Sequence, residues 1–161
     1  MTKVTVIGAG GYAGSHIAEA AVQRNFEVRG MTRSEVAMQI AGVNYERGSI
    51  LSPEDQARAI EGSDVVVVAI SPRGDMLGQA RPAIKELARL ADEAGVRLGV
   101  IGGAGSLQVS EGGPLVVESG FPEDYREEAL EMAGVLEDLR SSSESLDWFC
   151  VSPAGGFGAY N

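Results

Sequence analysis

Three glycines near the amino terminus, Gly8, Gly11 and Gly14, follow a short run of β-forming residues and precede a stretch with helical spacing. Glycines in such a turn let the backbone approach a pyrophosphate, while the free N–H groups and positive dipole end of the helix attract its charge. The spacing is G-x-x-G-x-x-G, although Gly8, Gly10 and Ala13 also fit G-x-G-x-x-A. Because the turn lies between a strand and a helix, it predicts a dinucleotide site, with an empty tight turn as the alternative.

A second predicted strand ends in the polar turn Thr32, Arg33 and Ser34, beside the expected adenosine ribose. In dinucleotide folds an acid at this place holds the 2′-hydroxyl of NAD, whereas an arginine accepts the 2′-phosphate of NADP. No acid occurs in this turn before Glu35. The sequence therefore favours NADP over NAD, with an Arg33 that merely caps the turn in solvent as the alternative.

Strand and helix patterns alternate along the whole chain. The predicted strands cover about residues 4–7, 25–32, 43–45, 63–70, 97–101 and 146–151, and the predicted helices about 13–22, 34–40, 53–61, 76–94 and 123–140. A brief extra strand is expected at 115–117. This alternation predicts an α/β fold, a Rossmann-like doubly wound parallel sheet with strand order 3-2-1-4-5-6 and helices on both faces.

Length, charge and composition narrow the function. A chain of 161 residues predicts one domain over residues 1–161. The net charge of −10 argues against nucleic acid as a partner. No apolar stretch is long enough to span a membrane, and the first strand leaves no room for a signal peptide, so we expect a cytoplasmic protein. The lone His16 predicts no metal site, and Cys150 is expected in the core.

Together with the glycine turn and Thr32 to Ser34, the segments at 100–107, 146–148 and 152–154 resemble the atypical short-chain dehydrogenase/reductase proteins. The nearest group is the NAD(P)H-binding, NmrA-like set that includes NADH-flavin reductases and biliverdin reductase B-like proteins. The resemblance implies pyrophosphate contacts at the glycine turn, ribose contacts after the fourth strand and nicotinamide contacts after the fifth. The expected cofactor-binding residues are Gly8, Gly10, Gly11, Tyr12, Ala13, Gly14, Thr32, Arg33, Ser34, Ala69, Ile70, Ser71, Gly102, Gly103 and Ala104.

The sequence departs from this resemblance at the catalytic pair. Typical members use Tyr-x-x-x-Lys, in which tyrosine is the general acid, but Tyr125 is followed four residues later by Ala129. Hydride transfer to a flavin, quinone or similar flat acceptor needs no such pair. We therefore expect an NADPH-dependent reductase, with Ser106 and Tyr125 as candidate hydrogen-bond donors to the acceptor. A non-catalytic NmrA-like NAD(P) sensor and an epimerase or dehydratase are the alternatives.

A further departure concerns the end of the chain. Members of the resembling group continue past the Ser-Pro-Ala segment at 152–154 into a strand and a helix that help to close the substrate pocket, whereas this sequence stops at Asn161. We expect a reduced or truncated substrate-binding lobe. The apolar surface left open would favour a homo-oligomer or a wide site.

Overall fold

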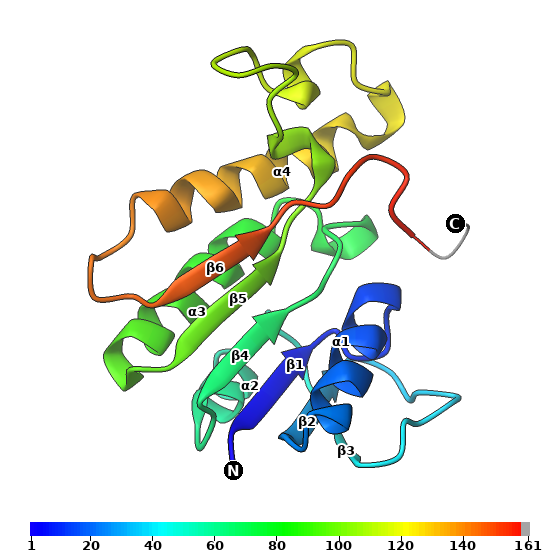
Figure 1. Cartoon of the computed structure of the whole chain (residues 1–161), viewed down its shortest axis with the longest axis vertical. Helices are drawn as coiled ribbons and strands as arrows, with labels where there is room; N and C mark the ends of the chain where they lie inside the picture. The colour runs from blue at the N-terminus through cyan, green and yellow to red at the C-terminus, as the bar shows by residue number, and fades with distance from the viewer. Residues whose placement is uncertain (159–161) are drawn as a thin grey trace.

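Six parallel strands form one sheet in the order β3-β2-β1-β4-β5-β6 in the computed structural model, which describes residues 1–158 (Figure 1). The strands are β1 (Lys3–Ile7), β2 (Glu27–Thr32), β3 (Val43–Arg47), β4 (Val65–Val68), β5 (Arg97–Ile101) and β6 (Trp148–Val151). Their carboxyl ends meet at one edge, where the glycine turn lies. The predicted α/β fold and strand order are confirmed.

Four helices cover the two faces of the sheet unequally: α1 (Tyr12–Gln23), α2 (Pro53–Ile60), α3 (Ala80–Ala94) and α4 (Glu123–Arg140). Helix α1 lies on one face, and α2, α3 and α4 lie on the other (Figure 1). The start of α2 follows local chemistry, because the Ser52 hydroxyl accepts a hydrogen bond from the Asp55 N–H and proline occupies the first turn. Helix α3 ends at Gly95, whose φ of +66° suits glycine.

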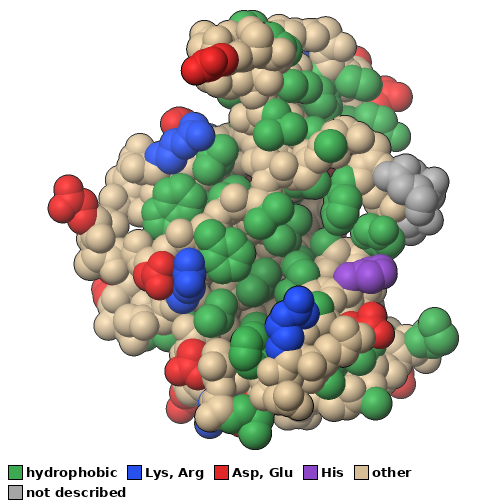
Figure 2. Space-filling view, in the orientation of Figure 1, with side chains coloured by type: hydrophobic (Ala, Val, Ile, Leu, Met, Phe, Trp, Pro, Cys, Tyr) green, Lys and Arg blue, Asp and Glu red, His purple; other side chains and the backbone are tan. Residues whose placement is uncertain are grey.

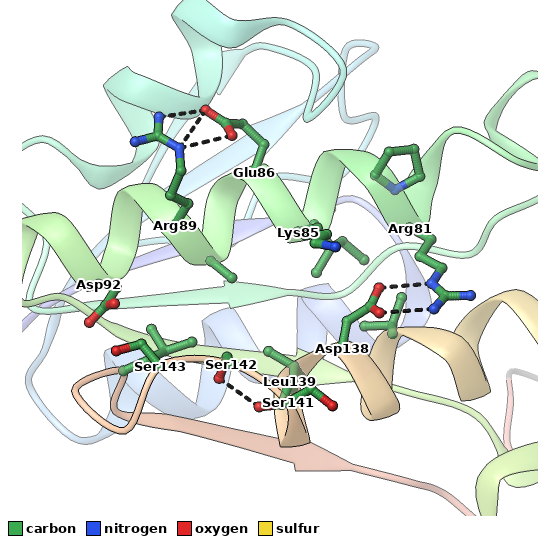
Figure 3. A pocket seen from close by; sticks show the side chains of 15 residues that line it. Arg81, Lys85, Glu86, Arg89, Asp92, Asp138, Leu139, Ser141, Ser142 and Ser143 are labelled. Carbon is green, nitrogen blue, oxygen red and sulfur yellow. Dashed lines mark hydrogen bonds and ion pairs between the residues drawn. The ribbon is translucent and has the colours of Figure 1, made fainter.

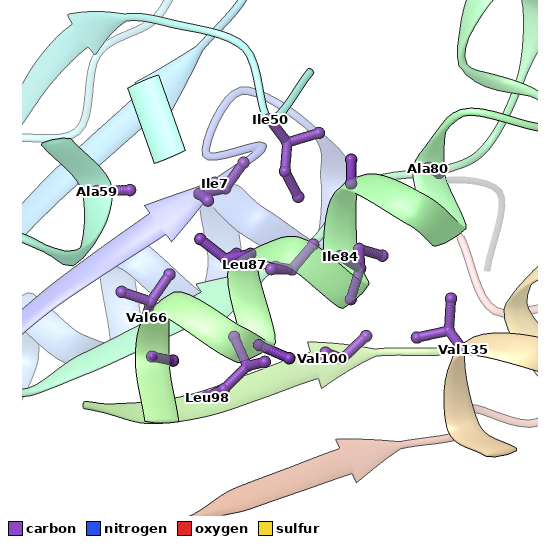
Figure 4. Close-up of a cluster of buried hydrophobic side chains, with 14 of the residues drawn as sticks. Ile7, Ile50, Ala59, Val66, Ala80, Ile84, Leu87, Leu98, Val100 and Val135 are labelled. Carbon is purple, nitrogen blue, oxygen red and sulfur yellow. The ribbon is translucent and has the colours of Figure 1, made fainter. Parts of the chain in front are cut away.

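The larger core lies between the sheet and the three helices on that face (Figure 4). Leu98 of β5 and Leu87 of α3 are both fully buried there. Burying one such side chain stabilises the fold by about 1.5–3 kcal/mol. Along β4, Val66 and Val68 face this core while Val67 faces α1. The unbroken valine run is therefore explained by a strand that is buried on both sides.

The opposite face is covered over only half of its width. Helix α1 packs on β1, β2 and β3 and helps to bury Val67 of β4, and within residues 1–158 no helix covers the same face of β5 and β6. Ile101 and Phe149 are half-buried there, and Val151 is 48% exposed. The Arg97 guanidinium lies 5.4 Å from the centre of the Phe149 ring. Hydrophobic side chains consequently gather in a hollowed region beside α1 (Figure 2).

The helix predicted at 34–40 is wrong, since these residues form bends. The local polar groups bond elsewhere: the Thr32 hydroxyl donates to the Ser34 carbonyl at 2.8 Å, and the Ile40 N–H donates to the Tyr45 hydroxyl at 3.4 Å. A helix of seven residues has too few internal hydrogen bonds to offset the cost of nucleation. Gly42, with φ of +89°, then turns the chain into β3.

Three smaller expectations also need correction. Helix α3 begins at Ala80 and not at 76, because Gly78 has φ of +78° and a 3₁₀ turn, η1 (Gly74–Met76), precedes it. The strand predicted at 115–117 is instead a 3₁₀ turn, η3 (Val116–Glu118), which buries Val117. Cys150 is half-buried and does not lie fully in the core. Among the residues described, no helix is long and apolar enough to cross a membrane.

Candidate functional site

The glycine turn is required by close packing between β1, α1 and β4. Gly8 has φ of +87°, and a Cβ there would lie 2.9 Å from the Ala69 carbonyl carbon. A Cβ at Gly14, in the first turn of α1, would lie 2.7 Å from the Gly8 carbonyl carbon. Gly10 is exposed, and a Cβ there would meet only side chains, the nearest at 3.3 Å. The geometry therefore favours the register of Gly8, Gly11 and Gly14.

The amino end of α1 is open to an anion. Gly11 is its N-cap and its N–H donates to the Gly8 carbonyl, but no side chain caps the helix and no acid stands in the first turn. By contrast, the first turns of α2 and α4 each carry two acids. The free N–H groups and positive dipole of α1 are thus left for a ligand.

Tyr12 and Ala13 begin α1 and sit at the mouth of this turn. The Tyr12 ring is 41% exposed and lies edge-on to Phe157, with 5.5 Å between ring centres. His16 is exposed and also contacts the Tyr12 ring, with ring centres 4.8 Å apart. Phe157 belongs to the segment that follows β6, so this aromatic contact joins the two ends of the described chain (Figure 1).

Thr32, Arg33 and Ser34, the three residues predicted at the turn after β2, have two different roles. Thr32 is buried, and its hydroxyl is used to hold the turn through the Ser34 carbonyl. The side chains of Arg33 and Ser34 are exposed. The Arg33 guanidinium donates to Asp75 at 2.8 Å, and Arg47 donates to the Arg33 carbonyl at 3.2 Å. Two guanidinium groups therefore stand at the edge where an adenosine 2′-phosphate would lie.

The loop after β4 runs past the glycine turn toward α4. Ala69 and Ile70 are half-buried, and the Ala69 N–H donates to the Ile7 carbonyl at 2.9 Å. Ser71 is exposed and its carbonyl accepts from the Arg73 N–H. The Arg73 guanidinium donates to Glu128 of α4 at 2.7 Å. This loop thus links the end of β4 to the start of α4 at the carboxyl edge of the sheet.

The ends of β5 and β6 form a second small-residue cradle. Gly102, Gly103 and Ala104 are half-buried, and the Gly102 N–H donates to the Val151 carbonyl at 2.8 Å. The Ser106 hydroxyl donates to the Gly103 carbonyl at 2.9 Å. Ser106 has no second hydroxyl proton to donate. The Ser152 hydroxyl, whose oxygen lies 2.8 Å from that of Ser106, must therefore donate to Ser106.

Cys150 lies directly beneath this cradle. A Cβ on Gly102 would come within 3.2 Å of its sulfur. Burial raises the pKa of the Cys150 thiol above its ordinary value, an effect partly opposed by Arg140, the Gly102 backbone and Ser152. The thiol is therefore protonated and unreactive near neutral pH.

The position that would hold a catalytic lysine is closed by packing. Tyr125, in the first turn of α4, is 52% exposed and lies 5.8 Å from the Arg73 guanidinium. One turn later, Ala129 is only 9% exposed. A Cβ added to Gly105 would lie 2.9 Å from the Cβ of Ala129. The 3₁₀ turn η2 (Ala104–Ser106) therefore leaves no room for a long side chain at position 129.

Residues 8–156 match the sequence model of a family described as NAD(P)H-binding. The chain belongs to this NAD(P)H-binding family. The glycine turn, the open amino end of α1 and the cradle after β5 lie within the matched residues, and the resemblance to atypical short-chain dehydrogenase/reductase proteins is confirmed.

Several relatives of this NAD(P)H-binding chain are about a third longer. The uncharacterized protein YwnB of Bacillus subtilis is 32% identical over 96% of this chain and 73% of its own length. A Streptococcus pneumoniae structure described as a "putative NADH-flavin reductase" is 31% identical with a TM-score of 0.82, covering 95% of this chain and 72% of that one. A Burkholderia pseudomallei structure, described as a "putative exported protein", is 33% identical with a TM-score of 0.81, and the match covers 96% of this chain and 73% of that one.

A hollow of about 500 Å³ lies away from the NAD(P)H-binding motifs, between α3 and α4 (Figure 3). Its apolar floor includes Ile84 and Leu139, and its rim carries the two hydrogen bonds, each 2.8 Å, from Arg81 to Asp138. The glycine turn and the cradle after β5 contribute nothing to its lining. The hollow is therefore separate from the candidate dinucleotide site at the strand ends.

The sequence alone did not indicate three residues that lie around the candidate dinucleotide site. Arg47 was missed because the third strand was expected to stop at residue 45, whereas β3 continues to 47. Nothing near Asp75 in the sequence indicated its ion pair, because its partner Arg33 lies 42 residues earlier in the chain. Ser152 belongs to the Ser-Pro-Ala segment at 152–154, and nothing in the sequence indicated its hydrogen bond to Ser106. Within residues 1–158, no group of three or more His, Cys, Asp or Glu side chains could hold a metal ion.

Proposed function

We propose that this chain is an NADPH-dependent reductase that transfers hydride to a flavin, a quinone or a similar flat acceptor. The observation that carries the proposal is the buried Ala129, which stands where the short-chain enzymes that this chain resembles keep a lysine. Without that lysine, Tyr125 lacks the partner that a tyrosine–lysine pair uses for proton transfer to the substrate. Hydride transfer to a flat acceptor needs no catalytic acid from the protein, because water can supply the proton and the site need only position the reactants.

The residues present suit a dinucleotide. When bound, its dihydronicotinamide would supply the hydride. Gly8 and Gly14 bring the backbone of β1 and α1 together, and the uncapped amino end of α1 would hold the pyrophosphate. At the other end of the crevice, Gly102 and Gly103 offer a surface without side chains for the nicotinamide.

The choice of NADPH is based on the turn after β2. Arg33 is exposed there, Arg47 donates to its carbonyl, and this turn holds no acid before Glu35. A guanidinium binds phosphate through paired, charge-assisted hydrogen bonds, which a ribose hydroxyl cannot match. The relative from Streptococcus pneumoniae supports the reductase class, while the preference for NADPH is argued from the residues at the turn after β2.

Tyr125 suits the acceptor better than Ser106 does. Ser106 has already given its proton to the Gly103 carbonyl, so its oxygen can only accept. Within the described chain, the hydroxyl of the half-exposed Tyr125 has no hydrogen-bond partner. We therefore assign Tyr125 as the hydrogen-bond donor to the acceptor, and Ser106 and Ser152 as residues that fix the floor of the site.

Turnover separates a reductase from its main alternative. Purified protein should oxidise NADPH when FMN, riboflavin or a simple quinone is added, and should leave NADPH unchanged when no acceptor is present. Binding of both redox forms with no turnover for any acceptor would instead identify a non-catalytic NAD(P) sensor. The missing tyrosine–lysine pair is the observation that keeps this second function open.

Arg33→Ala tests the assignment of the 2′-phosphate. Loss of one charge-assisted contact should weaken NADPH binding by about 1.5–3 kcal/mol and leave NADH binding unchanged. Fluorescence titration with both cofactors measures this difference. The control is Arg24→Ala, which removes an exposed arginine that bonds only to the Ala20 carbonyl within residues 1–158. Equal effects of Arg33→Ala on both cofactors would contradict the assignment.

A further inference from the structure

An ion pair crosses the glycine turn from one side of the site to the other. Arg33 follows β2 and Asp75 lies in η1, after β4, and the two side chains meet with 2.8 Å between Nη1 and Oδ2. Strands β2 and β4 are the two neighbours of β1 in the sheet. The pair therefore spans the carboxyl end of β1, where the proposed function places the pyrophosphate, and Arg33 stands where that function places the adenosine 2′-phosphate.

Both backbones that carry the pair are anchored. Asp75 precedes Met76, which is 3% exposed. The Asp75 carbonyl accepts a hydrogen bond from the Gln79 side chain at 2.5 Å. Arg33 follows the buried Thr32, and its carbonyl accepts from Arg47. A carboxylate is thus held in reach of Arg33 by the fold itself. Removing that carboxylate should change the charge at this place without moving the chain.

The position of Asp75 affects one cofactor more than the other. Asp75 uses one of the five N–H groups of Arg33, so a phosphate can still bind the rest of the guanidinium. A phosphomonoester carries about −1.5 to −2 charges at neutral pH and would be repelled by the neighbouring carboxylate. A free 2′-hydroxyl suffers no such repulsion and can donate to it.

We propose that Asp75 is a cofactor-selectivity residue, which weakens binding of the 2′-phosphate at Arg33 and so lets NADH compete with NADPH. The proposal rests on the proposed function, because it takes Arg33 as the 2′-phosphate contact. It predicts that the wild-type chain prefers NADPH only modestly. Neutralising Asp75 should make the preference strong.

The test uses two ligands that differ only in the 2′-phosphate, adenosine 2′,5′-bisphosphate and adenosine 5′-monophosphate, with affinities measured by calorimetry. Asp75→Asn should tighten binding of the bisphosphate by about fivefold at low ionic strength, less at high salt, and leave the monophosphate unchanged. The control is Glu61→Gln, which removes one exposed negative charge before β4, at the opposite edge of the sheet. In an Arg33→Gln background the effect of Asp75→Asn should fall sharply.

Two results would overturn the inference while leaving the proposed function intact. Weaker bisphosphate binding by Asp75→Asn would mean that Asp75 positions Arg33 in favour of the phosphate. An equal change for both ligands, or for Glu61→Gln, would mean a structural or long-range charge effect. If the wild type and Asp75→Asn both bind the bisphosphate no better than the monophosphate, the NADPH assignment itself fails.

Discussion

Replacing Gly14 by alanine should destabilise the whole fold. The new Cβ would lie 2.7 Å from the Gly8 carbonyl carbon and closer still to its oxygen, and both are backbone atoms at the end of β1. Because the interior is close-packed, α1 would have to move from β1 by about 1 Å. Overpacking of this kind costs about 1–3 kcal/mol. The gain from replacing a helical glycine, about 0.5–1 kcal/mol, offsets only part of that cost.

Thermal unfolding followed by circular dichroism measures the effect. A loss of 1–3 kcal/mol corresponds to a fall in Tm of roughly 2–10 °C for a chain of this size. The matched control is Gly134→Ala in α4, where the new Cβ would lie 2.6 Å from Cζ of the exposed Arg81 side chain. That guanidinium can swing away, at the cost of an exposed ion pair with Asp138 worth about 0–1 kcal/mol.

The two variants therefore separate backbone contact from helix propensity. Gly134→Ala should change Tm by no more than about 2 °C, because its gain and its loss nearly cancel. If Gly14→Ala is as stable as the wild type, α1 does not pack on β1 as closely as described. The explanation of the glycine spacing by this contact would then be wrong.

Two further predictions concern Arg29 and Cys150, whose side chains are half-buried. Arg29→Met should lower the free energy of unfolding by about 1–3 kcal/mol in urea denaturation, because Arg29 donates to Thr5, Ser63 and two carbonyls at the end of α2. The control Arg89→Met breaks only exposed ion pairs within α3 and should leave the free energy of unfolding nearly unchanged. Burial raises the pKa of the Cys150 thiol above its ordinary 9.0, so its stabilising contribution is complete below pH 9 and is lost as the pH rises through the folded-state pKa. The wild type should lose more stability than Cys150→Ala between pH 8 and pH 10 in urea denaturation, and parallel losses would refute this.

The sequence predicted the sheet because its signals are local. The valine run at 65–68 marks a strand buried on both faces, and Ser52 with the following proline marks the start of a helix. Parallel strands separated by helices admit few topologies, so the strand order followed. The helix predicted at 34–40 was wrong because so short a helix does not offset the cost of nucleation, and the Tyr45 hydroxyl accepts a hydrogen bond from the Ile40 N–H.

The candidate site could be predicted only where its geometry is made by the backbone. Glycine spacing reveals a close approach in any context, which is why Gly8 and Gly14 could be found. The ion pair between Arg33 and Asp75 depends on how two distant loops meet. The hydrogen bond between Ser106 and Ser152 depends in the same way on the pairing of β5 with β6. Such partners become visible only when the fold brings the loops together.

The half of the sheet that α1 leaves uncovered affects how the folding state of this protein can be assayed. Dyes such as 8-anilinonaphthalene-1-sulfonate fluoresce on exposed apolar surface, and their binding is often taken as a mark of a molten globule. Here Ile101, Phe149 and Val151 present such a surface on an ordered sheet. Bright dye fluorescence should therefore accompany an intact near-ultraviolet circular dichroism spectrum. Because the dye would bind the folded chain, it should also raise the apparent Tm, and a dye-based melting curve would report a complex more stable than the protein alone.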